Sequence, residues 1–227
     1  MTGLDPRIAR GTSRMLAFRD EAIAVGAEPL GWKAGFGAQA SLASLAIDRP
    51  LVGFLTRDRL LSSGATVSVA AWTRPVLEAE VAAHLASDIG AGATPVEALA
   101  AVGGWSVAIE LADVGYPPED VELILAGNIF HRLVLLGPVV PARPSSLSVS
   151  VLRDGERVAE TSDPETLTGG LGHVLSSMAD TLAACGAALR AGDVVITGSV
   201  IPPVPLEDGA TWIADAPGLG QVDVRLG

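Results

Sequence analysis

The chain lacks the residues that several classes of protein require, beginning with cysteine. Cys185 is the single cysteine among 227 residues, which excludes an intrachain disulfide and a metal site built from several thiolates. Because Cys185 lies in an alanine-rich stretch, we expect a small buried hydrophobic residue rather than a nucleophile. Long apolar runs are missing too, since 49% of the residues are hydrophobic but no run approaches the roughly eighteen residues of a membrane span. We therefore expect no membrane insertion.

Positive charge is also scarce. The formal net charge is −11, and no basic cluster occurs in the sequence. A nucleic-acid-binding protein needs a basic surface to displace the counterions of the phosphate backbone, so this class is excluded. The first thirty residues hold arginines and acids but no apolar core of a secretory signal. We expect a cytoplasmic protein whose partner is a small molecule.

Lysine is nearly absent, and Lys33 is the single one beside fourteen arginines. A GC-rich genome that encodes Arg in place of Lys accounts for the missing lysines but not for the retained one. An ammonium group is compact, and burial tunes its pKa, which a guanidinium does not allow. Lys33 is therefore either a functional residue or a chance survivor, and composition alone leaves both open.

Helix signals occur in four places. Asp5 and Pro6 suit the cap and first position of a helix that we expect to reach about Ala27. Further helices are expected at 94–102, from 117 onward and at 167–190. Strands are expected at 66–70, 76–85, 105–112, 133–140, 146–152, 157–161, 194–197, 211–214 and 221–226. Asp154 and Gly155 suit the tight turn of a hairpin between two of these strands.

The order of these elements predicts the fold class. The strands are short, are separated by turns and mostly do not alternate with helices, which favours a mixed α+β fold over a doubly wound sheet. We expect a helical N-terminal part, residues 1–65, that contains the Lys33 segment. It packs on a β-rich part, residues 66–227, with a long helix near the C-terminus. The two parts are expected to form one compact unit.

Three glutamates form the first candidate site. Glu78 and Glu80 are two residues apart, so a strand would project both carboxylates from the same face, about 7 Å apart along the backbone. A helix, which the alanines at 82–83 also allow, would place them about 200° apart. Glu110 lies in an apolar run, where an acid is costly unless it is paired or bound to metal. If the two strands are neighbours, three carboxylates converge. Their repulsion would raise their pKa values unless a cation such as Mg²⁺ or Mn²⁺ compensates. A solvated strand face fits the same pattern.

Several short motifs, in order along nearly the whole chain, resemble one family. They are GWKAG at 31–35, RPLVGFL at 49–55, LEAE at 77–80, AIELAD at 108–113, GDVVITGS at 192–199, PVP at 203–205 and GLGQVDV at 218–224. The chain resembles the 2-keto-4-pentenoate hydratase and 4-oxalocrotonate decarboxylase family, within the fumarylacetoacetase-like superfamily. The resemblance implies a mixed β-sheet roll or sandwich core.

The resemblance also implies a site and a reaction. It implies that Glu78, Glu80 and Glu110 hold Mg²⁺ (or Mn²⁺) and that Lys33 is catalytic. The substrate implied is a small 2-oxo or 2-hydroxy-dienoate acid of aromatic catabolism. A homo-oligomeric lyase would hydrate or decarboxylate this acid through a metal-stabilised dienolate. Residues expected to contact the substrate are Leu51, Gly53, Asn128, Thr197 and Ser199, and the turn at 197–199 fits a structural strand end equally well.

Some residues depart from the family pattern. Leu51 replaces an Asp of the hydratases and looks more like the decarboxylase branch. Gly115 replaces a basic residue, and Gly127 replaces an acid in a stretch that has also lost two hydroxyls. The substrate and the choice between hydration and decarboxylation therefore stay open. Acylpyruvate C–C hydrolysis is a further alternative, although such enzymes use a His–Glu pair on an N-terminal segment and no histidine precedes His84. A binding protein that has lost catalysis is the last alternative.

The histidines carry no metal-ligand pattern. His131 and Arg132 lie in the divergent stretch, and we expect them at the surface rather than on a substrate carboxylate. His84 and His173 have no local polar partners and are expected to be structural.

Overall fold

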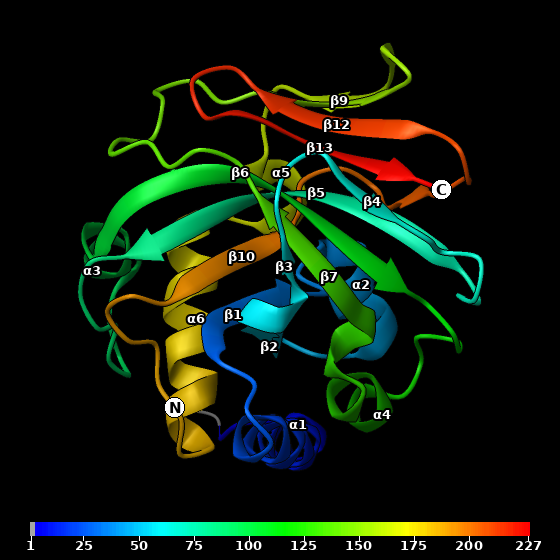
Figure 1. Ribbon diagram of the computed structural model, residues 1–227. Coiled ribbons are helices and arrows are strands. Elements are labelled where there is room, and N and C mark those ends of the chain that lie inside the picture. Colours follow the sequence, from blue (N-terminus) through cyan, green and yellow to red (C-terminus); the bar gives the residue numbers. More distant parts are fainter. Residues whose placement is uncertain (1–2) are drawn as a thin grey trace.

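The computed structural model describes residues 3–227 as two β-sheets with helices around them (Figure 1). The helices are α1 (Pro6–Ala24), α2 (Gln39–Leu45), α3 (Pro95–Ala100), α4 (Val121–Ala126), α5 (Glu165–Thr168) and α6 (Leu171–Ala184), with short 3₁₀ turns η1 (Arg57–Arg59) and η2 (Asn128–Phe130). None of the helices in the described residues is both long and apolar enough to cross a membrane.

An eight-stranded sheet forms the centre of the molecule. Its order is β2-β1-β10-β5-β6-β7-β3, with β11 paired to β5. Its strands are β1 (Pro29–Gly35), β2 (Leu51–Thr56), β3 (Leu60–Leu61), β5 (Pro75–Leu85), β6 (Val102–Asp113), β7 (His131–Leu136), β10 (Val194–Ser199) and β11 (Val204–Pro205). Neighbouring strands are mostly antiparallel, but β1 runs parallel to β10 and β3 parallel to β7.

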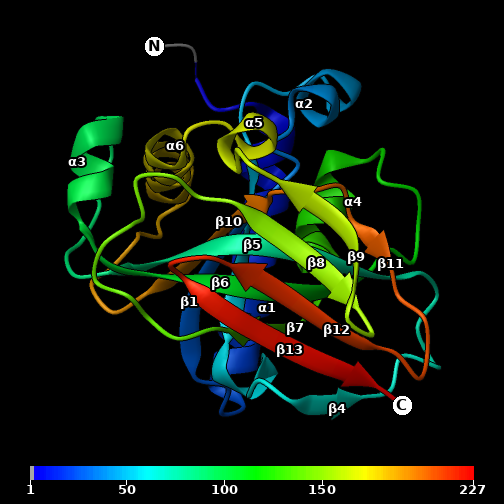
Figure 2. The same cartoon turned by 90° about the horizontal axis from the view of Figure 1, so that it is seen from above.

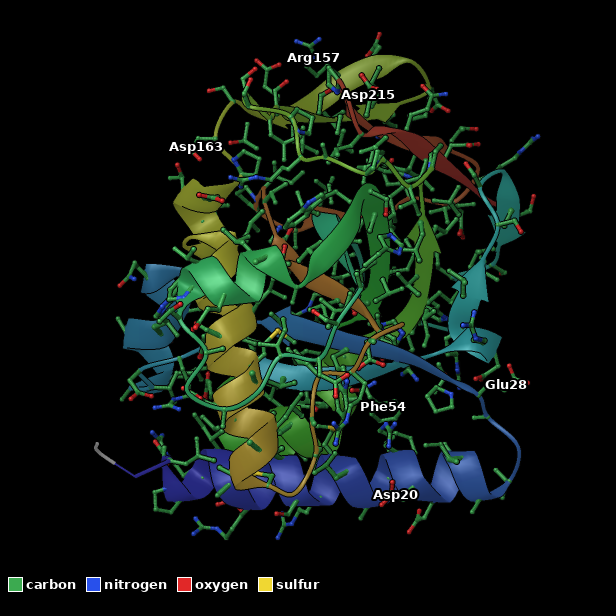
Figure 3. The ribbon with its side chains drawn as sticks, turned by 90° about the vertical axis from the view of Figure 1, so that its left-hand side faces the viewer. Asp20, Glu28, Phe54, Arg157, Asp163 and Asp215 are labelled. Carbon is green, nitrogen blue, oxygen red and sulfur yellow. The ribbon has the colours of Figure 1, made fainter. Side chains whose placement is uncertain are left out.

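A five-stranded sheet lies against one face of this sheet (Figures 1 and 2). Its order is β4-β13-β12-β8-β9, from β4 (Ala65–Val67), β8 (Val149–Arg153), β9 (Glu156–Thr161), β12 (Thr211–Ala216) and β13 (Gly220–Leu226). The main hydrophobic core fills the space between the sheets, where Ala79 and Val107 of the larger sheet join Val151, Val222 and Val224 of the smaller. Figure 3 shows the polar outer side of the small sheet, where Arg157 and Asp215 lie.

The mixed α+β class and the expected strands from 66 onward are confirmed, with ends shifted by a few residues. Asp154 and Gly155 turn the β8–β9 hairpin with φ values of 51° and 85°, as a type I′ turn requires. Asp5 caps α1 by accepting a hydrogen bond from the backbone N–H of Arg7. Cys185 ends α6 and is only half-buried, so the expectation of a buried thiol was wrong.

Two helix expectations were wrong in extent. The long helix expected at 167–190 is two helices, because Gly169 takes a φ of 78° between them, and α6 ends at Ala184. The helix expected from 117 begins only at Val121, where Asp120 accepts hydrogen bonds from the backbone N–H groups of Glu122 and Leu123. An acidic side chain thus replaces the proline pair as the start signal.

The residues expected as a helical N-terminal part also contain strands. β1 and β2 pair with each other, and β1 joins β10 in the middle of the large sheet. Both strands are buried on both faces, which removes the alternation of apolar and polar residues that marks a half-exposed strand. Helix α1 lies beneath this pair (Figure 1), and Phe18 packs edge-on against Phe54 at 5.7 Å, the latter labelled in Figure 3. The boundary at residue 65 stays a prediction.

Candidate metal centre

Strands β5 and β6 carry the three glutamates expected to form a site. The pair is antiparallel and long, and its register sets Glu78 directly opposite Glu110. Glu80 lies two residues beyond Glu78 and projects from the same face, while Ala79 and Val81 between and after them enter the core. The strand geometry that the motif requires is therefore confirmed. The alternative of a helix at this point was wrong.

The carboxylates converge in space. One oxygen from each of Glu78, Glu80 and Glu110 lies within 4.8 Å of the others. Glu80 and Glu110 are fully buried, and Glu78 is partly exposed. Glu80 Oε2 accepts a hydrogen bond of 2.6 Å from the backbone N–H of Gly198. Its Oε1 and the Oε2 of Glu110 are buried without a hydrogen-bond partner among residues 3–227, which is costly for a carboxylate unless a cation binds there.

Lys33 reaches the cluster from the neighbouring part of the sheet. It lies on β1, opposite Gly53 of β2 and Ile196 of β10, and only 1% of it is exposed. Its Nζ donates to Glu110 Oε1 and, at 3.2 Å, to the backbone oxygen of Ile129. The sheet order thus brings the single lysine beside the expected carboxylates, although 77 residues separate Lys33 and Glu110 in the chain.

His131 is a residue of this centre that sequence reasoning missed. Its side chain is 3% exposed, and its Nδ1 lies 2.8 Å from Glu110 Oε1. The expectation of a surface position was therefore wrong for His131, although Arg132 beside it is half exposed and pairs with Asp113 at 3.3 Å. The two side chains diverge because consecutive residues of a strand point to opposite faces, and both belong to β7, which was expected to begin only at residue 133. His84, expected to be structural, shares a hydrogen bond of 2.9 Å with Ser106 away from the cluster.

The three carboxyl groups have very different pKa values. Burial, with the charge of Glu110 in addition, raises the pKa of Glu78 to about 7 and also raises that of Glu80. Burial acts on Glu110 as well, but Lys33 and His131 outweigh it and hold the pKa of Glu110 at about 2. Since an ionised carboxylate only accepts hydrogen bonds, His131 donates to it from Nδ1. Burial lowers the pKa of His131 itself.

The donor set fits a hard divalent cation. All three candidate ligands are carboxylate oxygens, which Mg²⁺ and Mn²⁺ prefer. Two of them are unpartnered buried atoms, and burial together with the repulsion between the carboxylates raises the pKa values of Glu78 and Glu80, which a bound cation would oppose. Both Lys33 and His131 bind the same oxygen of Glu110, so its other oxygen stays available to an ion.

A cavity of about 520 Å³ opens onto the cluster. Lys33, Glu78, Thr197 and Ser199 line it, so two of the five residues expected to contact the substrate lie on its wall. The other three, Leu51, Gly53 and Asn128, lie outside that wall as far as residues 3–227 define it.

The structure gives those three residues different surroundings. Leu51 is fully buried in a core beneath the site. A Cβ at Gly53 would lie 2.9 Å from Lys33 Cγ and 2.6 Å from Asn128 Oδ1, so glycine leaves room for the lysine stem. Asn128 accepts from the N–H of Phe54 at 2.8 Å and donates to its oxygen at 3.0 Å, which ties η2 to β2.

Comparison with known proteins places the chain. Residues 24–226 match the family described as fumarylacetoacetate (FAA) hydrolase C-terminal. A 4-oxalocrotonate decarboxylase from Pseudomonas sp is 29% identical over 203 residues, 87% of this chain and 78% of that protein. The 2-keto-4-pentenoate hydratase 1 of Dechloromonas aromatica (strain RCB) is 27% identical over 207 residues, 88% of this chain and 78% of the relative.

Solved structures share the fold. One is the 4-oxalocrotonate decarboxylase of Pseudomonas putida G7, complexed with magnesium and adipate. It superposes with a TM-score of 0.88 at 22% sequence identity, and the match covers 95% of this chain and 85% of the decarboxylase chain. The fumarylpyruvate hydrolase of Pseudomonas aeruginosa, in complex with Mn²⁺ and pyruvate, has a TM-score of 0.67 at 19% identity, over 88% of this chain and 89% of its own.

Proposed function

The chain belongs to the fumarylacetoacetate hydrolase family, and we propose that it is a lyase that depends on Mg²⁺ or Mn²⁺. Its substrate would be a 2-oxo or 2-hydroxy-dienoate acid, which it would hydrate or decarboxylate. The observation that carries this proposal is the convergence of Glu78, Glu80 and Glu110 beside the buried Lys33, at a cavity large enough for a small acid. The names of the two curated relatives support the reaction class.

In this proposal the three glutamates hold the metal ion. Bound there, a divalent ion would polarise the 2-oxo group of the acid and stabilise the negative charge that develops on its oxygen. Surrounding side chains shield Glu80 and Glu110 from bulk water, since neither has exposed surface, and this would strengthen their interaction with the ion. Gly198, through its N–H on Glu80, fixes one ligand in place.

Lys33 is the proposed acid–base residue. An ammonium group has three N–H donors, and two of them are used by Glu110 and the oxygen of Ile129. Because Lys33 also lines the cavity, its third donor is available to the substrate. Its Nζ would hold or return the proton that moves to and from the carbon chain of the acid.

The hydrolase alternative has weaker support. C–C hydrolysis needs an activated water beside the ion, which relatives obtain from a His–Glu pair. His131 does pair with Glu110, but no histidine is part of the cavity wall within the described residues. A catalytically silent binding protein is also disfavoured, because the complete carboxylate cluster and the buried Lys33 beside it are both present. We further propose that the protein is cytoplasmic, and that it is a homo-oligomer working in aromatic catabolism, as the family resemblance implies.

Turnover measurements test the proposed reaction. The protein would be incubated in Mg²⁺ with 2-hydroxypentadienoate, 4-oxalocrotonate and an acylpyruvate, and the ultraviolet band of each acid followed. We expect loss of one of the first two bands, complete inhibition by EDTA and recovery with Mg²⁺. Turnover of the acylpyruvate alone, or of none of the three, would contradict the lyase proposal.

A lysine variant tests the role of Lys33. Lys33→Met should lower kcat at least about hundredfold at saturating Mg²⁺, the usual loss when a positioned acid–base group is removed. Arg74→Met is the matched control, because Arg74 is the other cation on the cavity wall but is exposed at its mouth. Equal effects of the two variants would contradict the assignment.

A further inference from the structure

The cavity above the carboxylates has apolar walls. Aromatic and aliphatic side chains from four separate segments enclose it: Phe36 after β1, Val114 after β6, Ile129 and Phe130 in η2, and Ile201 and Pro203 after β10. Phe36 and Phe130 lie with ring centroids 6.5 Å apart and form one side of the wall. An apolar wall of this kind favours an apolar part of a ligand, because burial of both surfaces removes them from water.

Three of the four hydroxyl groups on the wall, those of Thr168, Thr197 and Ser199, already donate within the protein, and Ser41 carries the fourth. Thr197 donates to the backbone oxygen of Val81 at 2.9 Å, and Ser199 donates to that of Ile201 at 2.6 Å. The hydroxyl of Thr168 donates to the backbone oxygens of Gly169, at 2.9 Å, and Pro164, at 3.2 Å. None of these three protons is therefore free to bind a polar group of a ligand.

The two cations on the wall, Lys33 and Arg74, are not placed to hold the far end of a ligand inside the cavity. The ammonium of Lys33 is bound to Glu110 at the base of the cavity. Arg74 is exposed at the mouth, where its Nε donates to the backbone oxygen of Val114 at 3.2 Å. An exposed guanidinium contributes little to a surface ion pair. Within the described residues, the wall holds no other lysine, arginine or histidine.

We propose that the site selects a 2-oxo acid with a single carboxylate and an extended apolar tail. This inference rests on the proposed function, which assigns the 2-oxo acid head to the carboxylate centre. A second carboxylate at the far end of the acid would lose its water without gaining a buried cation as its partner, which is unfavourable. The volume of about 520 Å³ lies within the range of pockets that enclose drug-sized ligands, so the tail extends beyond that of a five-carbon acid.

A series of ligands with tails of different length tests whether the wild-type protein prefers an extended apolar tail. Binding of pyruvate, 2-oxobutanoate, 2-oxohexanoate and 2-oxooctanoate would be measured by calorimetry at saturating Mn²⁺, because these acids share one head and differ only in the apolar tail. Each buried methylene should tighten binding by about fourfold, and 2-oxooctanoate should bind at least tenfold more tightly than 2-oxobutanoate. Equal affinities of the four acids would overturn the inference.

A matched pair of acids tests whether the cavity disfavours a second carboxylate. 2-Oxohexanoate and 2-oxohexanedioate have the same number of carbon atoms, but the second ends in a carboxylate. The diacid should bind at least tenfold more weakly. Tighter binding of the diacid than of the monoacid would overturn the inference.

A variant pair locates the effect in the wall. Val114→Arg adds a cation to the apolar wall and should reverse the order, so that the diacid binds more tightly than the monoacid. Val158→Arg makes the same change on β9, in the outer sheet, where Val158 is exposed, and should leave the order unchanged. Unaltered pyruvate binding shows that each variant is folded. If Val114→Arg retains pyruvate binding and still prefers the monoacid, the wall does not select the tail.

The series also separates this inference from the proposed function. If none of the acids, pyruvate included, binds the Mn²⁺-treated protein, the proposed metal centre fails. If pyruvate binds and the tail has no effect, the metal centre holds and the selection of an apolar tail fails.

Discussion

One oxygen of Glu110 accepts hydrogen bonds from both Lys33 and His131, which leaves its other oxygen for an ion. The sequence could identify the costly acid at 110 and the single lysine, because both stand out against their local composition. It could not identify His131, because a histidine beside an arginine at the start of a strand is ordinary at a surface. Nor could it show that Asn128 binds the backbone of Phe54, since that contact joins residues 74 apart in the chain.

A pair of histidine variants tests the contact to Glu110. His131→Leu removes the Nδ1 donor, so the carboxylate is less firmly oriented, and we expect Mg²⁺ to bind about 10- to 100-fold more weakly. His131→Asn keeps an N–H at the place of Nδ1, so its affinity for Mg²⁺ should fall much less. The control His84→Asn changes a histidine whose partner is Ser106, and its affinity should match the wild type. Wild-type affinity in His131→Leu would contradict the assigned role.

At the scale of elements, β5 and β6 were predictable and β1 and β2 were not. Strand β5 carries alternating glutamates and core residues, so its period is visible in the sequence. Strand β1 is buried on both faces and contains Gly31 and Gly35, which weaken every strand signal. Its glycines have a packing reason, because a Cβ at Gly31 would lie 1.9 Å from the backbone oxygen of Val194 on β10. The parallel β1–β10 pairing, which positions Lys33, therefore needs glycine there.

The strand pairing can be tested by one substitution. Gly31→Ala should lower the free energy of unfolding by at least about 2 kcal/mol, because a backbone atom of β10 has to move. Gly26→Ala is the control: Gly26 also has a positive φ, of 107°, but no atom lies within 4 Å of its added Cβ. Urea denaturation of both variants measures the difference. Equal losses would show that the close approach of β1 to β10 does not constrain residue 31.

At the scale of the whole molecule, the large sheet gathers chemistry from distant parts of the chain. It aligns Lys33 from the N-terminal third with the glutamates of β5 and β6 and with His131 of β7. Local patterns predicted the α+β class and the strand character of β5, while the order of strands came from no local signal. The motifs that resemble the family anticipated the gathering of Lys33 and the glutamates and also pointed to Thr197 and Ser199 on the cavity wall, but they did not indicate the apolar residues of that wall.

The clustered carboxyls predict how stability depends on pH without metal. Glu78 has a pKa of about 7 in the folded protein against 4.5 for an ordinary glutamate, so the folded state binds more protons between these values. Metal-free wild type should therefore lose stability as the pH rises from about 4.5 to 7, by about 3 kcal/mol at most relative to Glu78→Gln. Denaturation of both proteins in EDTA measures this difference.

Metal should reverse the trend. Saturating Mg²⁺ compensates the ionised carboxylates and should stabilise wild type above pH 7 much more than Glu78→Gln. A stability difference between the two proteins that does not change with pH would show that Glu78 titrates like an exposed glutamate.

Calorimetric titration with Mg²⁺ and Mn²⁺ at neutral pH tests the metal centre most directly. The account predicts one ion bound per chain in the wild type and in Glu156→Gln, a control on the exposed β8–β9 hairpin, and no binding in Glu80→Gln. A wild-type protein that binds neither ion, or a Glu80→Gln variant that binds like the wild type, would contradict it.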